Sequence, residues 1–110
     1  MTPRAYSEAT LQREIVLCLR KAGYLVTHVP IGDAWSRRRI RQSYMGTQPG
    51  WPDLVVCGSE GEVVFVEVKL PGGKLSPAQG VIHSRLRAMG HDVVVAKSVS
   101  DVVEHFCLIG

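Results

Sequence analysis

Apolar and polar positions follow a helical period in the first part of the chain. Five apolar residues recur at the spacing of one helical face: Leu11, Ile15, Cys18, Leu19 and Ala22. Ser7 precedes this pattern as a candidate N-cap, and Gly23 follows it as a helix terminator. The pattern therefore predicts a helix over residues 7–22.

Strand-like and helical patterns alternate along the rest of the chain. Short apolar runs bounded by glycine, proline or polar residues predict four strands, over residues 24–29, 53–57, 62–70 and 92–96. A second helix is expected over 76–89, opened by Ser76 and Pro77, and a short third helix over 98–107. Residues 31–51 are polar, basic and punctuated by glycine, so we expect a long loop there.

The predicted order, αβββαβα, favours an α/β fold. The first three strands can form a meander, and the second helix permits a crossover to a fourth strand of the same sheet. We therefore expect a central mixed four-stranded sheet flanked by helices, with a short C-terminal helix. At 110 residues the chain has the length of one domain, residues 1–110.

Composition and charge narrow the class of protein. The chain is 45% hydrophobic and 21% charged, as in ordinary globular proteins, and no apolar run is long enough for a transmembrane helix. No signal-peptide pattern is visible, and the three separated cysteines are expected to be reduced, so we expect a cytoplasmic protein. A net charge of +3 does not by itself indicate nucleic-acid binding. The four scattered histidines are expected at the surface or at strand ends.

The strand over 62–70 carries two charged residues in an apolar segment. Phe65, Glu67 and Lys69 alternate onto one face and valines occupy the other, so the strand is expected to be covered on both faces. A carboxylate and an ammonium group are unfavourable there unless they are paired or bind something. If this strand pairs with 53–57 through the short turn between them, Asp53 lies beside Glu67 and Lys69.

Two adjacent carboxylates and a lysine suit phosphodiester hydrolysis. The oxygens of Asp53 and Glu67 are the ligands that Mg²⁺ or Mn²⁺ prefers. Lys69 can orient an activated water or stabilise the charge that develops on the phosphate. The alternative is that Asp53 is only a turn residue after Pro52, and that Glu67 and Lys69 form an ion pair on an edge strand.

Four segments, in order and on the expected elements, carry a family resemblance. They are Ser7–Gln12, Gly50–Leu54, Val66–Lys69 and Leu75–Gln79. With them the chain resembles the PD-(D/E)xK nuclease superfamily and, more narrowly, a stand-alone VRR-NUC (virus-type replication-repair nuclease) domain. The resemblance implies a restriction-endonuclease-like αβββαβ core and a deoxyribonuclease that depends on Mg²⁺ or Mn²⁺, active in a bacterial or phage-infected cell.

The resemblance also implies roles for individual residues. Asp53 and Glu67 would bind the metal by their side chains, and Val68 would bind it by its backbone carbonyl. Lys69 would be the catalytic lysine. Gln79, one turn into the second predicted helix, would point back at the site.

The family also has an acidic residue on the first helix that reaches the metal through a water, and this chain offers two candidates. At 100° per residue, Glu8 falls within about 20° of Ile15, at the centre of the apolar face, whereas Glu14 lies about 100° away. Glu8 is therefore the expected catalytic residue, with Glu14 as the alternative.

The predicted loop before the Gly50–Leu54 turn is strongly basic. Four arginines fall within five positions and are expected to grip DNA phosphates: Arg37, Arg38, Arg39 and Arg41. Lys74 is a further candidate for a phosphate contact. Trp35 or Trp51 could stack on an unpaired base. The alternative is a solvated charge run, with the tryptophans packed in the core.

No sequence-reading module is evident, so we expect recognition of DNA shape. The resemblance implies a homodimer, which would present two active sites to branched DNA such as a four-way (Holliday) junction or a flap in repair. Candidate dimer surfaces are the exposed apolar part of the first helix and the C-terminal residues Val102, Val103, Phe106 and Leu108. Two alternatives are a non-catalytic nucleic-acid-binding subunit of a replication, repair or packaging complex, and a restriction-type nuclease.

Overall fold

The computed structural model describes residues 6–30 and 46–108 of the chain, and it contains the expected elements in the expected order. They are α1 (Glu8–Lys21), β1 (Leu25–His28), β2 (Leu54–Cys57), β3 (Val63–Val68), α3 (Pro77–Ala88), β4 (Asp92–Ala96) and α4 (Val99–His105). Each expected element ends within two residues of its observed bounds. The serines that were expected to cap the first two helices do so, because Ser7 and Ser76 accept hydrogen bonds from backbone N–H groups of α1 and α3.

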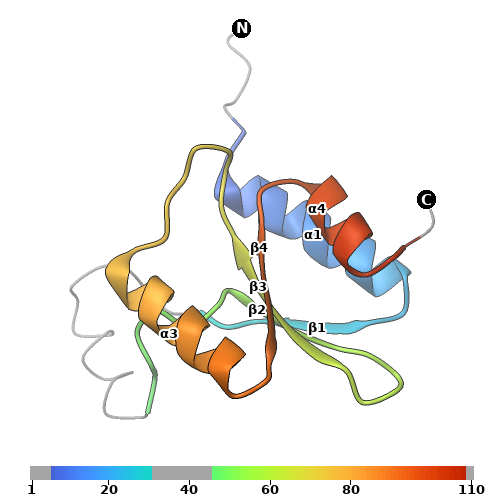
Figure 1. Ribbon diagram of the computed structural model, residues 1–110. Helices are drawn as coiled ribbons and strands as arrows, with labels where there is room; N and C mark the ends of the chain where they lie inside the picture. The colour runs from blue at the N-terminus through green and yellow to red at the C-terminus, as the bar shows by residue number, and fades with distance from the viewer. Residues whose placement is uncertain (1–5, 31–45, 109–110) are drawn as a thin grey trace, which may run out of the picture.

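The four strands form one mixed sheet in the order β1-β2-β3-β4. β1 pairs with β2, and β2 with β3, in antiparallel fashion, whereas β4 pairs with β3 in parallel fashion. The meander and the crossover through α3 are therefore both present, and the predicted fold class is confirmed (Figure 1).

Helices cover both faces of the sheet. One apolar cluster joins α1 and α4 to the face that carries Val64, Val66 and Val68. A smaller cluster joins Ile82 and Leu86 of α3 to the opposite face. Figure 1 shows the sheet edge-on between these layers. β3 is thus covered on both faces, as expected, and this explains why five of its six residues are buried.

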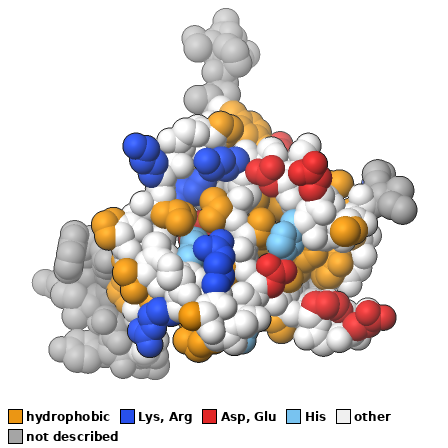
Figure 2. Space-filling model, viewed as in Figure 1, with side chains coloured by type: hydrophobic (Ala, Val, Ile, Leu, Met, Phe, Trp, Pro, Cys, Tyr) orange, Lys and Arg blue, Asp and Glu red, His pale blue; other side chains and the backbone are white. Residues whose placement is uncertain are grey.

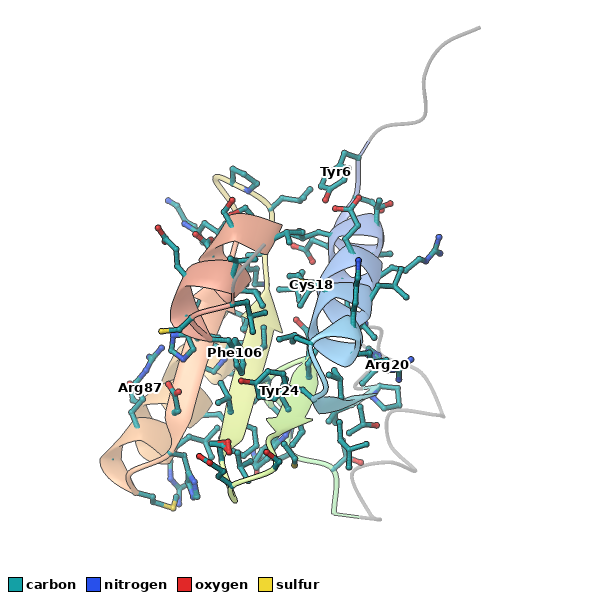
Figure 3. All side chains as sticks on the ribbon, turned by 90° about the vertical axis from the view of Figure 1, so that its right-hand side faces the viewer. Tyr6, Cys18, Arg20, Tyr24, Arg87 and Phe106 are labelled. Carbon is teal, nitrogen blue, oxygen red and sulfur yellow. The ribbon has the colours of Figure 1, made fainter. Side chains whose placement is uncertain are left out.

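The C-terminal helix is more deeply packed than expected for a dimer surface. Val102 is completely buried against the sheet, so it cannot belong to an exposed interface, which corrects that expectation. Phe106 is half-buried and meets Tyr24 edge-on, with ring centroids 5.0 Å apart. Figure 3 shows these two rings pointing toward one another. Val103 and Leu108 remain partly exposed.

The cysteines and the helix lengths can be stated for the described part of the chain. Cys18, Cys57 and Cys107 all lie within the described part of the chain, and all three are free thiols. Within residues 6–30 and 46–108, no helix combines the length and the apolar character needed to cross a membrane.

Candidate active site

Asp53 and Glu67 meet at the end of the sheet where β2 begins and β3 ends. The register pairs Leu54 with Val66, so the next residues outward, Asp53 and Glu67, stand opposite each other. Opposite residues of antiparallel strands project to the same face with Cβ atoms about 5 Å apart. The juxtaposition expected from the hairpin is therefore present.

The backbone of two neighbouring strands holds Asp53 in place. Its Oδ2 accepts a hydrogen bond from the N–H of Val68 at 2.7 Å, and its backbone carbonyl accepts one from the N–H of Val29 at 2.8 Å. The Asp53 carboxylate thus accepts the hydrogen bond of the β3 backbone at the point just before β2 begins, and the Asp53 backbone is held by the residue that follows β1. In an extended strand the N–H and C=O of one residue point to the same side, so the Val68 carbonyl also faces Asp53.

Glu67 is a carboxyl group buried beneath α3. Its side chain is only 1% exposed, and Oε1 lies 3.0 Å from Nε2 of His83, which is also 1% exposed. Burial, together with the hydrogen-bonding and repulsive effect of Asp53, raises the pKa of Glu67 from 4.5 to about 9. A cation or a proton must therefore accompany this carboxylate at neutral pH.

His83 corrects the expectation that each histidine lies at the surface or at a strand end. It is buried on α3, where burial and the charge of Arg87 lower its pKa and so favour the neutral imidazole. The signal was available in the sequence, because His83 follows Ile82 and precedes Leu86 by three residues, on the inner side of the helix. It also stands one turn after Gln79, which the sequence had already placed toward the site.

Gln79 divides its amide between a helix cap and Glu67. Its Oε1 accepts the backbone N–H of Ser76 at 2.9 Å, and Ser76 Oγ in turn accepts the N–H of Gln79 at 3.2 Å. Because a backbone N–H requires an acceptor, the amide nitrogen must face the other way. It donates to Oε2 of Glu67 at 3.4 Å, so Gln79 points at the site as expected.

A glycine brings the turn before Asp53 against the start of α3. Gly50 has φ of +86°, and a Cβ at this position would overlap the Ala78 carbonyl and lie 2.9 Å from the Gln79 nitrogen. The neighbouring Trp51 packs edge-on against Phe65, with centroids 5.4 Å apart, in the cluster beneath α3. For Trp51 the core-packing alternative is therefore the observed one. Gly50 and Trp51 together couple the Asp53 turn to the helix that holds Gln79.

Lys69 and Glu8 approach the carboxylate pair from different elements. Lys69 directly follows β3, and its N–H donates to the Ala96 carbonyl at 3.0 Å, so pairing with β4 continues past Val68. Its charge acts to lower the pKa of Glu67, whereas the charge of the exposed Glu8 acts to raise it. Glu14 instead accepts a hydrogen bond from the Tyr6 hydroxyl at 2.6 Å. Of the two α1 acids, Glu8 thus acts electrostatically on Glu67, whereas Glu14 is engaged by Tyr6.

The donor set suits a hard divalent cation, although a complete cage is not preformed. Asp53 and Glu67 offer carboxylate oxygens and Val68 offers a carbonyl, which is the ligand chemistry of Mg²⁺ and Mn²⁺. Among residues 6–30 and 46–108, no three His, Cys, Asp or Glu side chains converge as a metal site. Contact of Glu8 with the cation through a water stays a prediction.

The candidate DNA-contacting residues are only partly covered by the structure. Lys74 is exposed in the loop between β3 and α3. Figure 2 shows Lys and Arg side chains at the left and centre of the face in view, and Asp and Glu mostly at its right. The arginines at 37, 38, 39 and 41 and the tryptophan at 35 lie outside the described residues.

Comparison with known proteins yields one family. Residues 5–100 match the VRR-NUC domain family. A 49-residue segment is 47% identical to "Putative nuclease p44" of Acyrthosiphon pisum secondary endosymbiont phage 1, and it covers 44% of this chain and 53% of that protein. The chain thus spans about half the length of this phage relative.

Two solved structures share the fold. A VRR_NUC domain, 30% identical, superimposes with a TM-score of 0.72 over 93% of this chain and 99% of its own. A VRR_NUC domain protein superimposes with a TM-score of 0.73 over 94% of this chain and 88% of its own, and at 20% identity it shows likeness of fold alone.

Replacing Gly50 by alanine tests the coupling between the Asp53 turn and α3. We expect Gly50→Ala to lower the free energy of unfolding by roughly 1–3 kcal/mol, because the new methyl group overlaps the Ala78 carbonyl at a strained positive φ. Gly46→Ala is the matched control, since Gly46 has φ of +92° but no described residue lies within 4 Å of its Cβ position. Equal destabilisation of the two variants in urea unfolding would show that the contact with α3 does not matter.

The raised pKa of Glu67 predicts a pH-dependent stability without metal. Between pH 4.5 and about 9 the folded state keeps a proton that the unfolded chain has lost. The stabilisation is therefore complete below pH 4.5 and disappears as the pH rises through about 9. In EDTA, we expect the thermal midpoint of the wild type to fall more steeply over this range than that of Glu67→Gln. Parallel midpoint curves for the two proteins would mean that Glu67 is already ionised.

Proposed function

Because the chain belongs to the VRR-NUC domain family, we propose that it is a nuclease that hydrolyses DNA phosphodiester bonds with Mg²⁺ or Mn²⁺. The observation that carries the proposal is the facing pair Asp53 and Glu67, with Lys69 two residues beyond Glu67. The match over residues 5–100 and the phage relative support it.

The residues of the site divide the chemical work between them. Asp53, Glu67 and the Val68 carbonyl would hold the divalent cation, and Glu8 would contact it through water. Such a cation supplies Lewis acidity to the phosphodiester. Lys69 would orient the attacking water and stabilise the charge that develops on the phosphate oxygens, and Gln79 would steady Glu67. Attack with departure of the 3′ oxygen would leave a 5′ phosphate.

We propose branched DNA, such as a four-way junction or a flap, as the preferred substrate. The described part of the chain is a compact α/β domain whose elements are all used in the fold, with none left as a separate sequence-reading module. A homodimer would supply two active sites for two strands. The partly exposed apolar residues of α1 and α4, among them Leu17 and Val103, offer a surface for such a dimer.

The second candidate function is a nucleic-acid-binding subunit without turnover. Binding alone requires cations on the surface but no buried carboxylate beside a second one. Placing an ionised Glu67 in a nearly inaccessible position against Asp53 is unfavourable unless a cation is bound. The pair therefore favours the catalytic function.

Cleavage of labelled DNA tests the proposed activity. We expect the wild type to cut four-way junction or flap DNA faster than linear duplex in Mg²⁺ or Mn²⁺, and not to cut in EDTA. Asp53→Asn and Lys69→Met should each lower the cleavage rate by about 10²–10³-fold, because the first weakens the hold on the divalent cation and the second removes a positive charge from beside the reacting phosphate. Glu14→Gln is the control for removal of an acid on α1 and should retain activity.

Each failure has a distinct meaning. Asp53→Asn or Lys69→Met with wild-type rates would overturn the assignment of the site. Tight binding of junction DNA with no cleavage in either metal would favour the non-catalytic subunit. Equal rates on linear and branched DNA would leave a nuclease but remove the proposed preference for branched DNA.

The salt dependence of binding tests the proposed grip on DNA phosphates. Replacing Arg37, Arg38 and Arg39 by alanine should lower the slope of log K against log salt concentration by about 0.9 for each phosphate that the protein no longer neutralises, and Lys74→Ala by about one. Lys21→Ala is the control, because Lys21 is exposed at the opposite end of α1 from Glu8. Binding measured by fluorescence anisotropy in EDTA avoids cleavage. A slope unchanged from that of Lys21→Ala would contradict the proposed grip.

A further inference from the structure

His83 is a buried polar residue that the sequence resemblance leaves without a role. Its Nε2 is 3.0 Å from Oε1 of Glu67, and both side chains are 1% exposed. Its Nδ1 is buried and has no hydrogen-bond partner among the described residues. An unsatisfied buried polar atom costs about 1–3 kcal/mol, so an apolar side chain would serve the packing better. The contact with Glu67 is therefore the feature that needs explaining.

Together, His83 and Gln79 address both oxygens of the Glu67 carboxyl group. They stand four residues apart on α3, and residues at that spacing share one face of a helix. His83 contacts Oε1, and Gln79 donates to Oε2 at 3.4 Å. The contact of His83 with Oε1 is shorter than that of Gln79 with Oε2, because the Gln79 amide also accepts a hydrogen bond in the helix cap. Among the described residues, His83 is thus the main side chain of α3 that fixes the rotation of this carboxyl group.

We propose that His83 is a positioning residue that orients the Glu67 carboxylate for the divalent cation. The inference rests on the proposed function, because it assigns to His83 a part in that same site. With Glu67 ionised, the Nε2–H group donates to Oε1 and occupies one of its lone pairs, leaving the remaining lone pairs of the carboxylate for the cation. Hydrogen-bonding partners of metal-binding carboxylates commonly set metal affinity in this way.

Binding of Mn²⁺ alone, measured by calorimetry in the absence of DNA, tests the inference without a readout of activity. We expect His83→Leu to weaken Mn²⁺ binding by about 10–100-fold, because the carboxylate no longer has its fixed donor. His83→Gln should restore part of the Mn²⁺ affinity, since a glutamine side chain is long enough for its amide to donate to Glu67. His91→Leu is the matched control, because the His91 ring also contacts a β3 residue, Phe65, but its side chain is exposed.

The outcomes separate this inference from the proposed function. If Glu67→Gln leaves Mn²⁺ binding unchanged, the proposed metal site is wrong and the role of His83 falls with it. If Glu67→Gln abolishes binding but folded His83→Leu binds as tightly as His91→Leu, only the role of His83 is overturned. Should His83→Leu fail to fold, His83→Asn replaces it, because its shorter amide keeps polarity without the reach. Equal Mn²⁺ affinity of the Asn and Gln variants would then overturn the inference.

Discussion

A carboxyl group buried between a sheet and a helix is the constraint on which the rest of this site depends. Glu67 is almost inaccessible to solvent and lies opposite Asp53, so its negative charge is strongly disfavoured in the absence of a counter-charge. Hydrogen bonds from α3 and the nearby ammonium group of Lys69 stabilise the Glu67 carboxylate in this position. A site built in this way favours a proton or a cation beside its two carboxylates.

The placement of α3 links the fold to this chemistry. Gly50 allows the turn before Asp53 to approach the first turn of the helix, and the capping box at Ser76 sets the direction of the Gln79 amide. Asp53 is held in turn by hydrogen bonds from the N–H groups of Val68 and Val29, at the ends of the neighbouring strands β3 and β1. The positions of the Gly50 turn, the start of β2, the end of β3 and the start of α3 therefore depend on a few backbone contacts. We expect small displacements of α3 to disturb the pair of carboxylates formed by Asp53 and Glu67.

The sequence predicted the elements well because their signals are local. Apolar periodicity, the serine caps and the glycine stops define the helices. The short turn after Cys57 fixes the register of β2 and β3, so the pairing of Asp53 with Glu67 follows from the number of residues on each side of the turn. His83 was missed because a histidine on an inner helix face becomes informative only when the residue it faces is known. The packing of Trp51 on Phe65 and the burial of Val102 likewise depend on distances between elements, which no single segment encodes.

The proposed chemistry requires Asp53 and Glu67 to share a divalent cation. A crystal structure of the wild type with Mn²⁺ tests this requirement, because manganese gives an anomalous signal that locates the ion independently of any assumed ligands. We predict an anomalous peak in contact with carboxylate oxygens of both Asp53 and Glu67 and with the Val68 carbonyl. A peak bound elsewhere, or none between these residues while the hydrogen bond between Glu67 and His83 is intact, would contradict a shared cation.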